Sequence, residues 1–135
     1  MSSIAIAGDT SGSVVIAAPA VAGTTTLTLQ ATTGTVALQS DGIGFSQTWQ
    51  SFTAGSQRVS GTTYTNTTGK PIMVSIVSTG GGGLQTDLTI SSLLVSRTTI
   101  GAVGANYASA TGIVPPGATY SGTFNGSSST WFELR

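Results

Sequence analysis

Residues 72–90 read IMVSIVSTGGGGLQTDLTI, and this stretch decides the fold class. Its first seven residues predict the most apolar strand of the chain, and Leu88 and Ile90 alternate with polar residues in a second strand. The glycines at 80–83 are not followed by the Lys-Ser/Thr of a phosphate-binding loop. We therefore interpret them as the flexible tip of a hairpin between two strands.

The same pattern of short strands and turns continues on both sides of this stretch. Further strands are expected at residues 48–52, 62–66, 92–98, 120–124 and 130–134, and Tyr107, Ile113 and Val114 precede Pro115 and Pro116. Helical periodicity appears nowhere, and Asn125-Gly126 predicts a tight hairpin turn before Thr130. Strands at roughly 8–12 residue spacing with Gly, Asn and Pro turns predict an all-β fold, an antiparallel β-sandwich or jelly-roll-like knob.

The first 40 residues differ in kind from the rest of the chain. Residues 24–30 read TTTLTLQ and residues 35–38 read TVAL, so their apolar side chains alternate as in strands. Residues 1–40 contain no aromatic residue, whereas all nine aromatic residues lie between 45 and 132. Because large side chains dominate core burial, we expect a compact knob over 43–135 and a β-strand arm over 1–40.

The arm has apolar strand faces but no bulky residue with which to bury them. It therefore needs a partner surface, which is most simply provided by its own copies around a symmetry axis. The candidate residues of this oligomer or docking interface are Val14, Val15, Ile16, Leu27, Leu29, Val36 and Leu38.

Charge is scarce throughout the chain. Charged residues are 6% of 135 residues, there is no His and no Cys, and the formal net charge is zero. An ordinary domain has about 25% charged residues. Four Lys and Arg residues make no basic stripe for nucleic acid, and the absence of Cys excludes disulfides and thiolate metal sites. We expect no cofactor, no metal and no insertion into a membrane, since the longest apolar run, 14–22, is split by Pro19.

The chain also lacks the residue combinations that enzymes usually need for catalysis. A glycosidase needs two carboxylates about 5–10 Å apart, and no two acids are near in sequence. Each acid is more simply explained as a turn residue or a solvated strand position. A Ser or Thr nucleophile would need a base, and the chain has no His. We therefore expect a protein that is not an enzyme. The four acids are Asp9, Asp41, Asp87 and Glu133.

The few charges that remain lead to one specific expectation. Glu133 and Arg135 share a strand face at a spacing of two residues. Either Arg58 or Arg97 is a candidate partner for Glu133, within a subunit or across a trimer. The alternative is that each charge is isolated in solvent, because exposed ion pairs contribute little.

The aromatic residues suggest glycan binding, because Trp and Tyr rings stack on sugar faces. The candidate glycan contacts are Trp49, Tyr64, Tyr107 and Tyr120. The alternative is that Trp49 and Trp131 belong to the core. Asn66 and Asn125 both begin glycosylation-like tripeptides, which Asx-turn chemistry explains more simply.

Several stretches resemble proteins of bacteriophage particles. Residues 12–38, GSVVIAAPAVAGTTTLTLQATTGTVAL, resemble a segment of phage tail-fibre and other virion structural proteins. QTWQSF (47–52), GTTYTNTTGKPIMVSI (61–76), VPPGATYS (114–121) and WFELR (131–135) are similar to the distal domain of tail-fibre-like proteins.

This resemblance implies a trimeric, all-β component of the virion, and it supplies no catalytic residues. With about 40 residues ahead of the knob, we expect a short fibre, a tip protein or a capsid decoration protein. Its expected partners are its own copies and another virion protein of the capsid or tail. The alternative function is a receptor-binding tip that recognises a host surface glycan.

Overall fold

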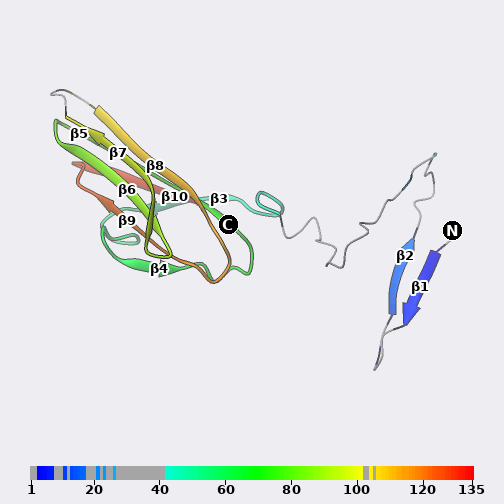
Figure 1. Cartoon of the computed structure of the whole chain (residues 1–135). Coiled ribbons are helices and arrows are strands. Elements are labelled where there is room, and N and C mark those ends of the chain that lie inside the picture. The colour runs from blue at the N-terminus through cyan, green and yellow to red at the C-terminus, as the bar shows by residue number, and fades with distance from the viewer. Residues whose placement is uncertain are drawn as a thin grey trace. The chain divides into compact units, whose positions relative to one another are not determined.

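The computed structural model describes residues 3–7, 11, 13–17, 21, 23, 26, 42–101, 104 and 106–135. The chain divides into two units, Met1–Val36 and Ala37–Arg135. Every regular element in the described residues is a β-strand, and every pair of strands is antiparallel. The expectation of an all-β, sandwich-like fold is therefore confirmed (Figure 1).

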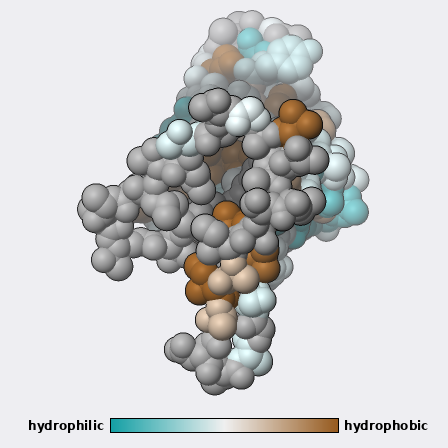
Figure 2. All heavy atoms as spheres, turned by 90° about the vertical axis from the view of Figure 1, so that its right-hand side faces the viewer, coloured by the Kyte–Doolittle hydropathy of each residue, from teal (hydrophilic) through white to brown (hydrophobic). Residues whose placement is uncertain are grey.

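The N-terminal unit contains a two-stranded hairpin. β1 (Ser3–Ala7) pairs with β2 (Ser13–Ala17) so that Ile4 lies opposite Ile16. This register places Ile6 and Ile16 on one face and Val15 on the other. All three side chains are exposed, and hydrophobic atoms of this hairpin are brown in Figure 2. A two-stranded hairpin by itself is only marginally stable in water.

The described residues of the C-terminal unit form eight strands in two four-stranded sheets. One sheet, here called the β10 sheet, has the order β3-β10-β5-β8, and the other, the β6 sheet, has the order β4-β9-β6-β7. The strands are β3 (Trp49–Thr53), β4 (Thr63–Thr65), β5 (Ile72–Gly80), β6 (Leu84–Ile90), β7 (Leu93–Ile100), β8 (Asn106–Val114), β9 (Thr119–Phe124) and β10 (Ser128–Leu134).

The pairing of these strands is nested. The first of the eight strands pairs with the last, the second with the seventh, the third with the sixth and the fourth with the fifth. The block is thus one long antiparallel hairpin folded into two sheets, joined further by the β10–β5 and β9–β6 pairs. On one side the sheets meet where Thr98 Oγ1 of β7 donates to the carbonyl of Ser109 in β8, at 2.6 Å.

The core lies between the two sheets and is centred on Trp131. Ile72, Val74 and Ile76 of β5 pack there against Leu88 of β6. Alternate residues of β5 are fully buried because successive side chains point to opposite faces of a sheet. Of the two tryptophans expected in the core, Trp131 is fully buried and Trp49 is 53% exposed.

Two predicted hairpins are wrong in their pairing. The glycines at 80–83 separate β5 from β6, but β5 belongs to the β10 sheet and β6 to the β6 sheet. Asn125 and Gly126 likewise connect β9 to β10 across the sandwich. The side chain of Asn125 binds to β6, where its Oδ1 accepts a hydrogen bond from the amide of Gln85 at 2.7 Å. A Cβ on Gly126 would lie 2.7 Å from the carbonyl oxygen of Thr79, so the close approach to β5 requires glycine.

Candidate functional site

The predicted docking residues lie only in part within the described residues. Val15 and Ile16 of β2 are exposed, and Val14 lies in β2 opposite Ile6. The predicted strands at 24–30 and 35–38, with Leu27, Leu29, Val36 and Leu38, lie outside the described residues. The exposed hairpin positions therefore retain the apolar surface on which the docking hypothesis depends.

The predicted glycan platform does not form. Tyr120 is 2% exposed and points into the core, and Tyr64 is half-buried against Trp131 with ring centroids 6.0 Å apart. A sugar ring on the surface has no access to the Tyr120 side chain. Trp49 and Tyr107 are exposed on the outer face of the β10 sheet, but on edge strands at opposite ends of it. Three strand spacings and six residues separate them by roughly 25 Å, too far for one sugar residue.

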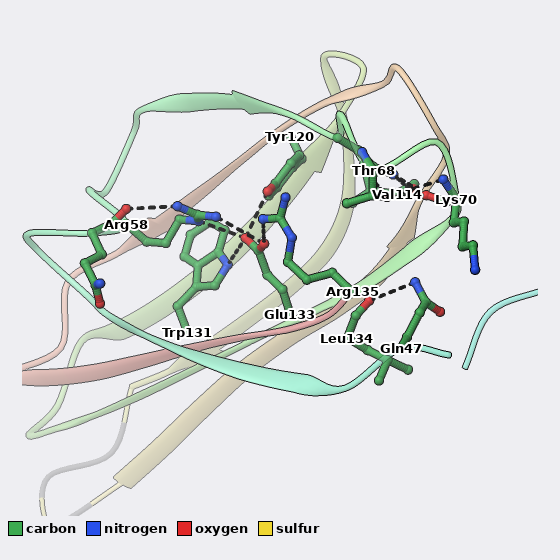
Figure 3. Close-up of polar contacts among 12 residues, drawn as sticks. Gln47, Arg58, Thr68, Lys70, Val114, Tyr120, Trp131, Glu133, Leu134 and Arg135 are labelled. Carbon is green, nitrogen blue, oxygen red and sulfur yellow. Dashed lines mark hydrogen bonds and ion pairs between the residues drawn. The ribbon is translucent and has the colours of Figure 1, made fainter. Parts of the chain in front are cut away.

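A buried carboxylate occupies one end of the sandwich interior. Glu133 of β10 is fully buried, so the expectation of a solvated strand position for it is wrong. Figure 3 shows the side chains that converge on it from three parts of the fold. Oε1 accepts from Arg58 Nε at 2.8 Å, Tyr120 Oη at 2.9 Å and Trp131 Nε1 at 3.0 Å. Oε2 accepts from Arg58 Nη2 at 3.1 Å and Arg135 Nη1 at 2.6 Å.

Arg58 is the predicted partner of Glu133 that the structure confirms. It lies in the segment between β3 and β4, and its guanidinium contacts both carboxylate oxygens. The guanidinium also lies over the rings of Phe52, 4.0 Å from the centroid, and Tyr64, at 4.6 Å. These cation–π contacts and the bidentate pair fix the β3–β4 segment to the core.

The cluster lowers the pKa of Glu133 and raises the pKa of Tyr120. Burial alone would raise the pKa of Glu133, but hydrogen bonds from Arg58 and Tyr120 and the charge of Arg58 outweigh burial and lower it. Burial, followed by the negative charge of Glu133, raises the pKa of Tyr120 to about 12. Glu133 is therefore ionised and Tyr120 is neutral at physiological pH. A carboxylate with five donors and no exposure has no free lone pair directed at a substrate.

The other carboxylate within the two sheets, that of Asp87, lies on the outer side of the β6 sheet. Thr86 and Leu88 point into the sandwich, so Asp87 between them points outward. Asp87 is nevertheless only 6% exposed, so the expectation of a solvated strand position is wrong for it as well. Arg97 of β7 donates to Oδ1 of Asp87 at 2.9 Å and to Oδ2 at 2.7 Å. The hydrogen bond from Arg97 lowers the pKa of Asp87, aided by Gln85. Arg97 is thus not the partner of Glu133, and the two carboxylates do not converge on one cleft.

The outer face of the β6 sheet is lined by hydroxyl groups. Thr63, Thr89, Ser92, Thr119 and Ser121 surround a shallow hollow of about 60 Å³. Small-molecule sites usually measure roughly 300–1,000 Å³ and are mostly apolar. Within the part of the chain that the structure describes, no group of three His, Cys, Asp or Glu side chains could hold a metal ion. No helix among those residues is long and apolar enough to span a bilayer.

The outer face of the β10 sheet carries an apolar row that sequence reasoning missed. The strand register aligns Trp49, Leu134, Met73 and Ile113 across β3, β10, β5 and β8. We call these four residues the apolar row. The signal was present in the sequence, since Phe132 and Leu134 alternate with the inward Trp131 and Glu133. Only the register, however, aligns residues from four separate strands.

The Asx turn expected at Asn66 is confirmed. Its Oδ1 accepts from the amide of Thr68 at 3.1 Å, and its Nδ2 donates to the carbonyls of Lys70 and Val114 at 2.7 and 3.0 Å. The side chain is 1% exposed and joins the β4–β5 turn to the end of β8. It therefore has a structural role at that end of the sandwich.

Comparison with protein-family models, with curated proteins and with solved structures gives no match to this chain.

Proposed function

We propose that this chain is a non-enzymatic structural protein of a bacteriophage particle, a short trimeric fibre or capsid decoration protein. Its N-terminal arm docks the knob or joins the subunits. The observation that carries the proposal is the exposed apolar hairpin, in which Ile6, Val15 and Ile16 have no cover within the described residues. Burial of these side chains in a shared interface stabilises it by roughly 25 cal/mol per Å².

The strand order supports this kind of protein. Eight consecutive strands in two four-stranded sheets, with nested pairing from the outermost to the innermost, support the proposal of a jelly roll. Capsid and lectin domains use this architecture, although a fold by itself does not determine function. The phage assignment rests on the resemblance of residues 12–38 and of the four stretches between 47 and 135.

The hydrogen bonds and ion pairs of the two carboxylates support a role without catalysis. Glu133 is saturated by donors, and Asp87 is held by Arg97 and Gln85. General acid–base catalysis requires a group that can exchange a proton with a substrate. The ion pairs in the described residues instead connect strands and loops of the same subunit.

The molar mass of the full chain in solution tests the trimer. Light scattering at micromolar concentration should give about three times 13.4 kDa. Ile6→Ser combined with Ile16→Ser should reduce the trimer, whereas Ser13→Thr in the same hairpin should not. A monomer at this concentration contradicts the proposal.

The location of the protein tests the virion assignment. Antibodies against the full chain should label intact particles of the phage that encodes it, at regular positions on the capsid or tail. A chain that is abundant in infected cells but missing from purified particles is not a virion protein.

The second candidate function, a receptor-binding tip, is favoured by the hydroxyl-lined hollow of the β6 sheet. Thr89 and Ser121 lie beside each other there in the register, and their hydroxyls can bond sugar hydroxyls. A glycan array with the full chain should then give a signal that Thr89→Val weakens and Thr99→Val, outside the hollow, does not. Absence of binding to arrays and to susceptible cells removes this candidate.

A further inference from the structure

The outer face of the β10 sheet has no charged side chain. Its outward positions are Trp49, Ser51 and Thr53 on β3, Ser128, Thr130, Phe132 and Leu134 on β10, Met73, Ser75, Val77 and Thr79 on β5, and Tyr107, Ser109, Thr111 and Ile113 on β8. The apolar row crosses all four strands at one end, and Phe132 lies in the next row. Trp49 and Ile113, at the two edges, are 53% and 58% exposed.

The turn that precedes β3 extends this apolar end. Ile43 and Phe45 are exposed in the turn at 43–46. Gln47 attaches the turn to the row, since its Oε1 accepts from Gly44 N at 2.5 Å and its Nε2 donates to the carbonyl of Leu134 at 3.3 Å. The chain therefore enters this unit at the end of the sheet that carries the apolar row.

We infer that this face is where copies of the chain meet, with Trp49 of one copy packed against Ile113 of the next around a threefold axis. The inference rests on the trimer proposed above and names its contact surface in the C-terminal unit. When three identical faces close around an axis, the β3 edge of each meets the β8 edge of its neighbour. Leu134 and Met73, on the two central strands, then face the axis.

Charge favours a second copy as the occupant of this face. Two uncharged surfaces can meet without burying an unpaired ion or bringing like charges together. Two of the hydroxyls in the adjacent row already have a partner, because Ser75 Oγ and Thr111 Oγ1 lie 3.1 Å apart. The outer face of the β6 sheet differs, since covering it would remove the half-exposed guanidinium of Arg97 from water.

The estimated area of this face indicates that the arm also contributes to the contact between copies. Four strands about 4.8 Å apart and seven residues at about 3.3 Å each give a surface on the order of 450 Å². A standard interface buries about 800 Å² on each partner. The face is therefore about half of a stable interface, and the exposed hairpin of the N-terminal unit provides further apolar surface.

Cysteine cross-linking tests the contact, because the natural chain contains no Cys. Within one subunit Trp49 and Ile113 lie three strand spacings apart, roughly 14 Å, beyond the reach of a disulfide. Trp49→Cys with Ile113→Cys in the full chain should therefore give covalent trimers under mild oxidation. The matched control is Trp49→Cys with Leu94→Cys, because Leu94 is 48% exposed and lies opposite Thr89 on the β6 sheet.

Three cross-linking results overturn the inference: no product above that of the control, covalent dimers only, or trimers from the control in equal yield. If a cysteine variant does not fold, the dissociation of the trimer is measured at equilibrium on single-substitution variants instead. Ile113→Thr should raise the concentration at which trimers dissociate by roughly tenfold or more, and Leu94→Thr should leave it unchanged. Equal effects of the two substitutions overturn the inference.

These results are distinguishable from a failure of the proposed function. A wild-type chain that is monomeric contradicts both proposals. A wild-type trimer whose Trp49 and Ile113 variants behave as their controls contradicts only the contact surface named here.

Discussion

The two sheets of the C-terminal unit each contain one acidic side chain, and they direct it to opposite sides. Glu133 in the β10 sheet points into the sandwich, where Arg58, Arg135, Tyr120 and Trp131 satisfy it. Asp87 in the β6 sheet points outward and pairs with Arg97. As a result the β10 sheet has an outer face without charge, whereas the β6 sheet has an ordinary polar face. We take this difference to separate the face that meets other copies from the face that remains in water.

The largest expected effect is at Glu133. Glu133→Gln keeps the shape of the side chain but leaves Arg58 and Arg135 without a counter-charge. Removing one partner of a buried ion pair costs about 3–5 kcal/mol of unfolding free energy. Urea denaturation should show this loss, and a change below about 1 kcal/mol would mean that the cluster contributes little.

The inner faces of the sheets also differ, and a smaller effect follows from this. The β10 sheet contributes Trp131, and opposite it the β6 sheet contributes Gly122, where a Cβ would overlap Ile76 Cδ1 and Trp131 Cζ3. Gly122→Ala should cost about 1–3 kcal/mol by overpacking. Gly101→Ala, with no atom near its Cβ position, is the matched control. Equal melting temperatures for the two variants would contradict the close packing of the sheets.

The buried cluster around Glu133 should make stability depend on pH in both acid and alkaline solution. The pKa of Glu133 lies below its ordinary 4.5, so its contribution is present above pH 4.5 and is lost as the pH falls through the lowered value. The pKa of Tyr120 is raised from 10.0 to about 12, so its contribution is lost as the pH rises between these values.

Glu133→Gln should flatten the acid loss and bring the pKa of Tyr120 closer to 10, because the adjacent negative charge is removed. Absorbance titration of the tyrosines follows this change. Asp87→Asn, on the other sheet, should leave the tyrosine titration unaltered, and an equal shift in both variants would contradict the assignment.

The smallest effect is expected at Asp87 itself. The Asp87 side chain is only 8% exposed, but its partner Arg97 is half exposed, so solvent screens the pair and its contribution to stability is small. Asp87→Asn should lower the melting temperature by about 3 °C or less. A loss as large as that of Glu133→Gln would remove the distinction between the two sheets.

The strands of the C-terminal unit were predictable from the sequence because their alternation is local. The predicted strands at 48–52 and 84–90 correspond to β3 and β6, for example. The pairing was not predictable, because nothing near Gly80–Gly83 or Asn125 indicates that the next strand joins the other sheet. The burial of Glu133 also depends on Arg58, which lies 75 positions earlier in the chain. The apolar row required the register of four strands.

Quenching of tryptophan fluorescence by acrylamide tests most directly whether the outer face of the β10 sheet is covered by other copies. The chain has two tryptophans, the buried Trp131 and the half-exposed Trp49, and Trp49→Phe isolates the signal of Trp131. In the assembled wild-type chain both tryptophans should be protected, and dilution below the dissociation concentration should make Trp49 accessible while Trp131 stays protected. If Trp49 is quenched equally in the assembled and the dissociated protein, the face is open to solvent and the account is contradicted.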